Sequence, residues 1–205
     1  RRMDRPVRRK IAGMTKGPVR LDVAVGYAVP RAGIPAAVSF RKWVAAALAG
    51  RIREADLAIR VVDEKEGRAF NHHYRGKDYA TNVLSFPAEL PEGLPEGVRL
   101  PLLGDLVLCA PVIAKEAAAQ GKPLAAHYAH LTVHGTLHLL GWDHEDPREA
   151  ECMEQLERGI LAGLGLPQPT RFAVKANTLV LIDTCGFHAR AQSDSVKIGV
   201  ILPLT

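Results

Sequence analysis

The chain of 205 residues lacks an apolar run of about 18 residues, the length that a membrane-spanning helix needs. Glycine and proline interrupt its longest apolar stretches, and it has no internal repeat or low-complexity tract. These absences argue against a membrane-spanning protein and a repeat protein. The length instead suits one soluble domain with a substantial core.

Cysteine is also scarce. Cys109, Cys152 and Cys185 are an odd number, and no Cys-x-x-Cys pair is present. The spacing therefore gives no indication of a thiolate metal site or a paired redox centre. We expect reduced thiols in a cytoplasmic protein.

The N-terminal segment is basic but lacks the apolar middle region of a secretory signal. We expect a disordered arm over residues 1–16, with Met14 as a candidate natural start. A metal-dependent hydrolase domain is expected over 17–169. Residues 170–205 contain β-like runs without an obvious partner, and we expect an extension of unknown role there.

The formal net charge is +5 and the sequence pI is about 9.3. Such a charge favours an anionic partner, because lysine and arginine near phosphates release condensed counterions. The first ten residues contribute part of the excess, so a solubilising tail explains it equally well.

Apolar periodicity predicts an α+β fold with a small mixed sheet covered by helices on one side. We expect an edge or hairpin strand over 19–29 and short strands over 57–62, 82–86 and 106–109. We expect helices from a Ser39 cap to Gly50, from Asp63 to Gly76, over 112–120, over 124–140, and from an Asp146 cap to about 163. A proline-rich loop is expected over 87–101.

Three histidines suggest a metal site at the end of a helix. His134 and His138 are four residues apart, so they share one helical face, and Gly141 permits a turn that returns His144 to the same point. Three neutral imidazoles can bind one zinc ion and leave a position for water, whose pKa zinc lowers to about 7. Nickel and copper also suit such a set. His127 and His130 are weaker candidates, which half-buried helix histidines would explain equally well.

The histidine spacing also matches that of the metzincin metalloproteases. Those enzymes place a glutamate directly after the first histidine, where it serves as general base. This chain has Gly135 at that position. A peptidase mechanism therefore lacks its proton acceptor.

A second polar segment offers cationic groups for phosphate. Arg75 has a planar fork that suits phosphate oxygens, and Lys77 adds a second positive charge. The alternative is that both side chains form surface ion pairs with Asp78 or Glu66. Beside a metal site, a guanidinium would stabilise charge that develops on a phosphodiester.

Three blocks of sequence, in order, resemble the YbeY family of endoribonucleases over residues 21–167. They are Tyr74-Arg75-Gly76-Lys77-Asp78 with Thr81-Asn82-Val83-Leu84-Ser85-Phe86-Pro87, then Gly104-Asp105-Leu106, then Ala129-His130-Leu131 leading into His134-Gly135-Thr136-Leu137-His138-Leu139-Leu140-Gly141-Trp142-Asp143-His144. The last block is the most specific. The chain departs from the family pattern at Ala80, where proline is usual, and we expect this change to be harmless.

The resemblance implies a zinc-dependent endoribonuclease that cleaves single-stranded RNA, with one zinc ion per chain. It implies a role in 16S rRNA 3′-end maturation and ribosome quality control, with the rRNA precursor and the small ribosomal subunit as partners and neither DNA nor a membrane. By position, His134, His138 and His144 would be the zinc ligands. Arg75 would be the catalytic, substrate-binding arginine, with Lys77 as a further substrate contact.

The expected mechanism is attack of zinc-bound water on a phosphodiester. The general base stays open between bulk water, His130 and the RNA 2′-hydroxyl. Asp143 would orient a ligand histidine or the turn. Two other classes also stay open: a metalloprotease, and a non-catalytic ribosome assembly factor stabilised by zinc.

Overall fold

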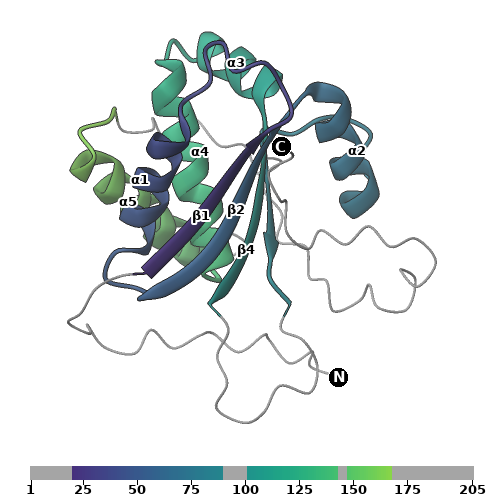
Figure 1. The fold of residues 1–205 in the computed structure, drawn as a ribbon. Helices are drawn as coiled ribbons and strands as arrows, with labels where there is room; N and C mark the ends of the chain where they lie inside the picture. Colours follow the sequence, from purple (N-terminus) through teal and green to yellow (C-terminus); the bar gives the residue numbers. More distant parts are fainter. Residues whose placement is uncertain (1–19, 90–100, 143–146, 168–205) are drawn as a thin grey trace.

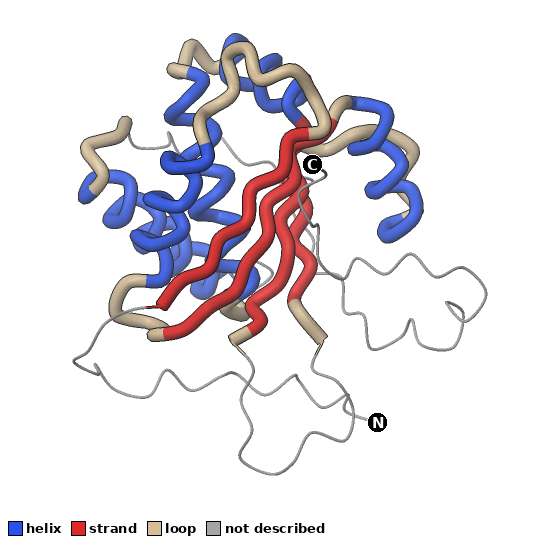
Figure 2. The backbone as a smooth tube through the Cα atoms, viewed as in Figure 1, coloured by secondary structure: helices blue, strands red, loops and turns tan. Residues whose placement is uncertain are grey.

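The computed structural model describes residues 20–89, 101–142 and 147–167 (Figures 1 and 2). The predicted N-terminal arm, most of the predicted proline-rich loop, the predicted cap Asp146 and the C-terminal extension lie outside these residues. His144 and Asp143 also lie outside them. Among the described helices, none has the length and apolar character needed to cross a membrane.

Four strands form one mixed sheet in the order β1-β2-β4-β3. Their bounds are β1 Arg20–Tyr27, β2 Glu54–Val62, β3 Val83–Pro87 and β4 Leu102–Cys109. β1, β2 and β4 are parallel, and β3 is antiparallel to β4. The first strand is an edge strand as predicted, but its parallel pairing with β2 rules out a hairpin.

Five helices are described, and they cover both faces of the sheet (Figure 1). Their bounds are α1 Ala37–Leu48, α2 Glu64–Arg75, α3 Ala110–Ala119, α4 Leu124–Leu139 and α5 Pro147–Gly163. The predicted α+β class with a small mixed sheet is confirmed. The prediction that helices cover one side only is wrong, because α2 lies on the opposite face from α1, α4 and α5.

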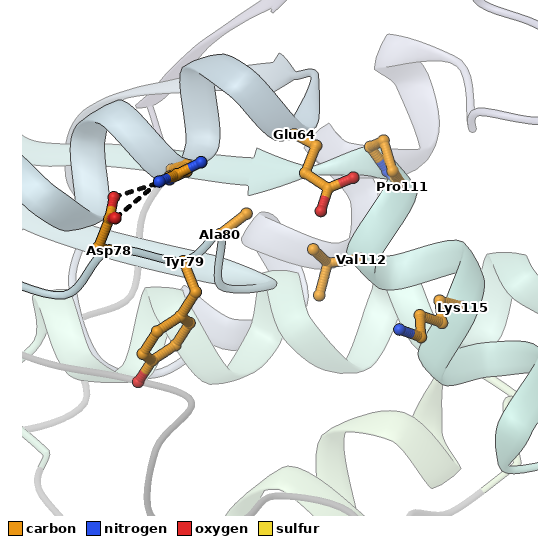
Figure 3. Close-up of a pocket in the computed structure, with 8 residues that line it drawn as sticks. Glu64, Asp78, Tyr79, Ala80, Pro111, Val112 and Lys115 are labelled. Carbon is orange, nitrogen blue, oxygen red and sulfur yellow. Dashed lines mark hydrogen bonds and ion pairs between the residues drawn. The ribbon is translucent and has the colours of Figure 1, made fainter.

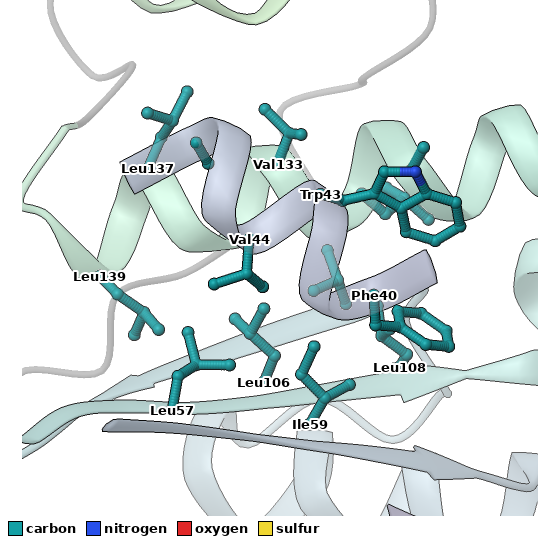
Figure 4. Close-up of a cluster of buried hydrophobic side chains, with 14 of the residues drawn as sticks. Phe40, Trp43, Val44, Leu57, Ile59, Leu106, Leu108, Val133, Leu137 and Leu139 are labelled. Atoms are coloured by element: carbon teal, nitrogen blue, oxygen red, sulfur yellow. The ribbon is translucent and has the colours of Figure 1, made fainter. Parts of the chain in front are cut away.

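The larger core fills the space between the sheet, α1 and α4 (Figure 4). Alternate residues of β2 point into it, and Ile59 is fully buried there. Phe40 of α1 packs edge-on against Trp43 and against Tyr128 of α4, with ring centroids 5.2 and 5.9 Å apart. Burial of this apolar surface holds α4 against the sheet.

A smaller core explains the position of α2. Phe70 and Tyr74, one helical turn apart, pack against Phe86 of β3. Val107 and Cys109 of β4 join the same cluster. β4 is therefore buried on both faces, because its neighbouring residues Leu106 and Leu108 belong to the larger core.

The bounds of α1, β2 and β4 correct the sequence predictions. α1 begins after Ala36, which has no side-chain cap, so Ser39 lies within the first turn and the predicted Ser39 cap is wrong. The helix starts as soon as the chain leaves Pro35. β2 and β4 begin before the predicted 57 and 106, because backbone pairing extends them through polar residues such as Glu54 and Asp105.

Candidate metal centre

Four histidines form a row along α4. His127, His130, His134 and His138 follow one another at helical spacing, and none is more than 4% exposed. Successive ring centroids are 6.4, 6.1 and 4.8 Å apart. The row lies inside the protein because every residue of α4 from Ala126 onward is buried.

His134 and His138 have the closest rings of the row. Their ring planes are inclined at 75° to each other. The prediction that these two side chains share one helical face is confirmed. In the described ranges, no group of three or more His, Cys, Asp or Glu side chains could hold a metal ion, and the third predicted ligand, His144, is outside those ranges.

Gly141 follows the helix as expected. α4 ends at Leu139, and Gly141 has φ +86°, a left-handed conformation that glycine adopts without strain. Its backbone N–H donates to the carbonyl of His138 at 2.8 Å. The chain therefore leaves the helix directly after the second predicted ligand.

Glu157 of α5 binds two histidines of the row at once. Its Oε1 lies 2.5 Å from His134 Nδ1, and its Oε2 lies 3.1 Å from His130 Nε2, both within hydrogen-bond distance. The glutamate is 4% exposed, so both bonds lie inside the protein. Such a carboxylate needs partners for both oxygens, and these two histidines supply them.

The charge states of this group follow from its contacts. Burial alone would raise the pKa of Glu157, but His134 and His130 outweigh burial and lower the pKa below its ordinary value. Burial lowers the pKa of His130, against the opposing effect of Glu157. At neutral pH we therefore expect an ionised glutamate and a neutral His130.

The residues present fit a zinc ion. Zinc binds neutral imidazole nitrogens, and its histidine ligands commonly donate their other ring N–H to a carboxylate. His134 makes such a bond through Nδ1, so Nε2 would be its ligating nitrogen. The donor set of the described residues is thus suited to the predicted ion, and His134 and His138 would be two of its ligands.

His127 belongs to a separate polar group. Its Nε2 lies 2.9 Å from Glu116 Oε2 of α3. Asn82 Nδ2 donates to the same carboxylate at 2.9 Å, and Asn82 Oδ1 accepts from the N–H of Val83. This group ties the start of β3 to α3 and α4, which favours the interpretation of His127 as a buried structural histidine.

Gly135 lies where β3 and β4 approach α4 most closely. A Cβ atom at this position would lie 2.8 Å from Leu106 Cδ2 and 3.1 Å from Ser85 Oγ. Ser85 also donates its hydroxyl to the carbonyl of Gly135 at 3.3 Å. A glutamate at this position would collide with the sheet, which gives a packing reason for the glycine and disfavours a metzincin-like base here.

Arg75 lies at the end of α2, on the face of the sheet opposite the larger core. Its Nη1 is 3.4 Å from Asn71 Oδ1, and burial lowers the pKa of its guanidinium. The structure brings it into no direct bond with His134 or His138. Lys77 is exposed in the segment that follows the helix.

The alternative that Arg75 and Lys77 form ion pairs with Asp78 or Glu66 is not supported by the contacts of the described residues. Asp78 binds Arg68 through two hydrogen bonds of 2.7 and 2.6 Å. Glu66 binds Arg60 at 2.7 Å. Both carboxylates are thus engaged elsewhere, so the cationic groups of Arg75 and Lys77 are not neutralised by them.

Sequence reasoning missed Glu157 and Glu116. A signal for Glu157 was present: it lies four residues after Met153 and four before Leu161, on the buried stripe of α5. An acidic side chain on an apolar stripe indicates a buried partner. No such local signal marks Glu116, which is partly exposed.

A cavity of about 380 Å³ lies where α2, the segment before β3 and α3 meet (Figure 3). Its lining includes two acidic side chains, Glu64 and Asp78, and two basic ones, Arg68 and Lys115. These charges balance, so the cavity has no net attraction for phosphate. None of the predicted site residues lines it.

The family model and the similar proteins found by comparison point to the same family. The family model described as endoribonuclease YbeY matches residues 36–165. Proteins named endoribonuclease YbeY from Xanthomonas axonopodis pv. citri and Stenotrophomonas maltophilia are 83% and 80% identical over 156 residues, 76% of this chain and 97% of each relative. A solution structure from Thermotoga maritima is 19% identical, with a TM-score of 0.47, over 70% of this chain and 91% of that one.

An α+β domain with paired histidines on a buried helix is thus matched to proteins named as endoribonucleases. The chain belongs to the YbeY family. The resemblance inferred from the three sequence blocks is confirmed.

Proposed function

We propose that this protein is a zinc-dependent endoribonuclease that cleaves single-stranded RNA. Its expected role is 3′-end maturation of 16S rRNA and ribosome quality control in the cytoplasm, with the rRNA precursor and the small ribosomal subunit as partners. The observation that carries the proposal is the close pair His134 and His138 backed by the buried carboxylate of Glu157. Membership of the YbeY family supports the choice of RNA as substrate.

The zinc ligands in this proposal are His134, His138 and His144. When bound, zinc supplies a Lewis acid that activates water for attack on a phosphodiester. The protein contributes a dry and fixed setting, because His134 and His138 are 4% and 1% exposed. Their burial on a packed helix limits the movement of both rings.

Arg75 and Lys77 would bind the RNA backbone. The two carboxylates considered as their partners, Asp78 and Glu66, bind Arg68 and Arg60 instead, so both cationic groups can pair with phosphate oxygens. Because Arg75 has no direct bond with the histidines, it would act on RNA that extends to the metal centre. There it would stabilise negative charge on the substrate.

The contacts of His130 reduce the number of candidates for the general base. This histidine is 4% exposed, and its Nε2 is bonded to Glu157. Both facts argue against proton abstraction from a substrate by His130. Bulk water and the RNA 2′-hydroxyl are the better candidates.

The test uses full-length protein, zinc-loaded and chelator-stripped, with a single-stranded precursor 16S fragment and a DNA of the same sequence. We expect cleavage of the RNA alone, loss of cleavage on stripping and recovery on zinc addition. His138→Ala should lose zinc retention and cleavage together, while His72→Ala, on the exposed side of α2, should keep both.

Full cleavage by stripped protein would contradict the zinc step. Cleavage of a peptide but not of RNA would instead favour the metalloprotease alternative. Zinc retention with RNA binding but no cleavage would favour the non-catalytic assembly factor. Arg75→Ala further separates the nuclease from the assembly factor, since a scaffold should show only weaker, salt-dependent binding.

A further inference from the structure

Glu157 stands out among the buried groups because it comes from a different helix than the histidines it binds. It reaches from α5 to α4 and uses each carboxylate oxygen for a different ring. Its neighbours on the buried side of α5, Met153 and Leu161, belong to the larger core and hold the helix in place. The carboxylate is therefore fixed by packing that does not involve the histidines.

The two bonds determine which ring nitrogens carry protons. An ionised carboxylate only accepts hydrogen bonds, so His134 must donate from Nδ1 and His130 must donate from Nε2. A neutral imidazole carries one proton. In its neutral form, which is the form that can bind a metal ion, a His134 that donates from Nδ1 has its lone pair on Nε2.

We propose that Glu157 is a positioning residue that fixes the tautomer and ring orientation of His134 for metal binding. The inference rests on the proposed function in taking zinc as the ligand of His134. Without Glu157, packing alone would limit rotation of the His134 ring, and the ring could carry its proton on either nitrogen. The carboxylate fixes both the ring orientation and the position of the proton before zinc binds.

A second carboxylate offers a matched control. Glu116 binds His127 on the same helix at 2.9 Å, but His127 is not a predicted zinc ligand. Replacing Glu116 also removes a carboxylate that binds a buried histidine, without touching His134. A purely structural role for such carboxylates predicts similar effects at both positions, whereas a positioning role predicts an effect on zinc only for Glu157.

The first measurement needs no variant. In metal-free full-length protein, at a pH where the His134 ring is neutral, its ring nitrogen chemical shifts should report a protonated Nδ1 and an unprotonated Nε2. The opposite tautomer, or a mixture of the two, would overturn the proposal. This result does not depend on whether the protein cleaves RNA.

The second measurement is zinc affinity, by competition with a chromophoric chelator, in full-length Glu157→Ala, Glu157→Gln and Glu116→Gln. We expect about 10- to 100-fold weaker binding for Glu157→Ala. The zinc affinity of Glu157→Gln should lie between those of the wild type and Glu157→Ala. Its amide oxygen can accept from His134, while its NH₂ group cannot accept from His130. Glu116→Gln should bind zinc as the wild type does.

Equal zinc affinity in the wild type and both Glu157 variants would overturn the proposal. A loss of zinc affinity in Glu116→Gln as large as that in the Glu157 variants would also overturn it. If Glu157→Ala does not fold, the zinc affinity of Glu157→Gln and the ring nitrogen chemical shifts of wild-type His134 still test the proposal. Absence of zinc binding by the wild type would instead contradict the proposed function, while the tautomer of His134 would still test the role of Glu157.

Discussion

At Gly135, a single missing side chain lets the predicted ligand helix lie against the sheet. A Cβ there would press on Leu106 and Ser85. Both contacts are with fully buried side chains, which have little free space into which to shift. A metzincin has its general base, a glutamate, at this same position. The close packing at Gly135 therefore also disfavours a metzincin mechanism.

We predict that Gly135→Ala lowers the free energy of unfolding by about 1–3 kcal/mol, because the extra methyl overpacks the contact. The control is Gly159→Ala in α5, where an added Cβ has nothing within 4 Å. That control should be neutral or stabilising by about 0.5–1 kcal/mol. Urea denaturation measures both, and equal changes would contradict the close approach at Gly135.

Asp105 is a second residue with a measurable consequence. It lies on β4, and burial raises the pKa of its carboxyl to about 6. A raised pKa means that the folded protein holds the proton more tightly than the unfolded chain does. Stability is therefore highest below the unfolded pKa of about 4 and falls as pH rises through 6.

We predict that Asp105→Asn, which stays uncharged, is more stable than the wild type at pH 7.5 by about 1–2 kcal/mol, after allowing for partial water contact. At pH 4 the difference between the two proteins should be smaller by this amount. Urea titrations at several pH values measure it. A difference that does not change with pH would mean that Asp105 ionises normally in the folded protein.

At the scale of elements, the ends of α2 follow directly from local sequence. Asp63 Oδ1 accepts from the N–H of Glu66 at 2.7 Å, and Gly76 ends the helix with φ +65°. Both features were predicted from residue type and spacing alone. Ser39 is of equally suitable type, yet it lies inside the first turn of α1, since tertiary packing and Pro35 set where that helix starts.

We predict that Asp63→Ala lowers the free energy of unfolding by about 1 kcal/mol, the usual effect of losing an N-cap. Ser39→Ala should change it much less, because Ser39 caps nothing. Urea denaturation of the two variants compares the helices directly. A larger effect at Ser39 than at Asp63 would contradict both assignments.

The face on which α2 packs could not be predicted. Phe70 and Tyr74 mark its apolar side, but β4 presents apolar residues in both directions, such as Leu106 on one face and Val107 on the other. Local pattern therefore allows α2 on either face. The apolar surface that α2 covers forms only when β3 pairs with β4 in the complete sheet.

At the scale of the whole molecule, the site combines a local motif with distant partners. The pairing of His134 with His138 was predictable, because helical geometry fixes it. The bonds from Glu157 join residues 23 and 27 positions apart in sequence and depend on how α5 packs on α4. No short-range pattern encodes that packing. The parts of the prediction that involve His144 and residues 170–205 stay predictions.

The most direct test of the proposed metal centre is X-ray absorption spectroscopy of full-length protein loaded with one equivalent of zinc. We predict three imidazole nitrogens and one exchangeable oxygen at about 2.0–2.1 Å from the ion, and loss of this bound-zinc spectrum in His138→Ala, which should not retain the ion. An ion enclosed by four protein ligands, or a spectrum unchanged by His138→Ala, would contradict a catalytic site built from His134, His138 and His144.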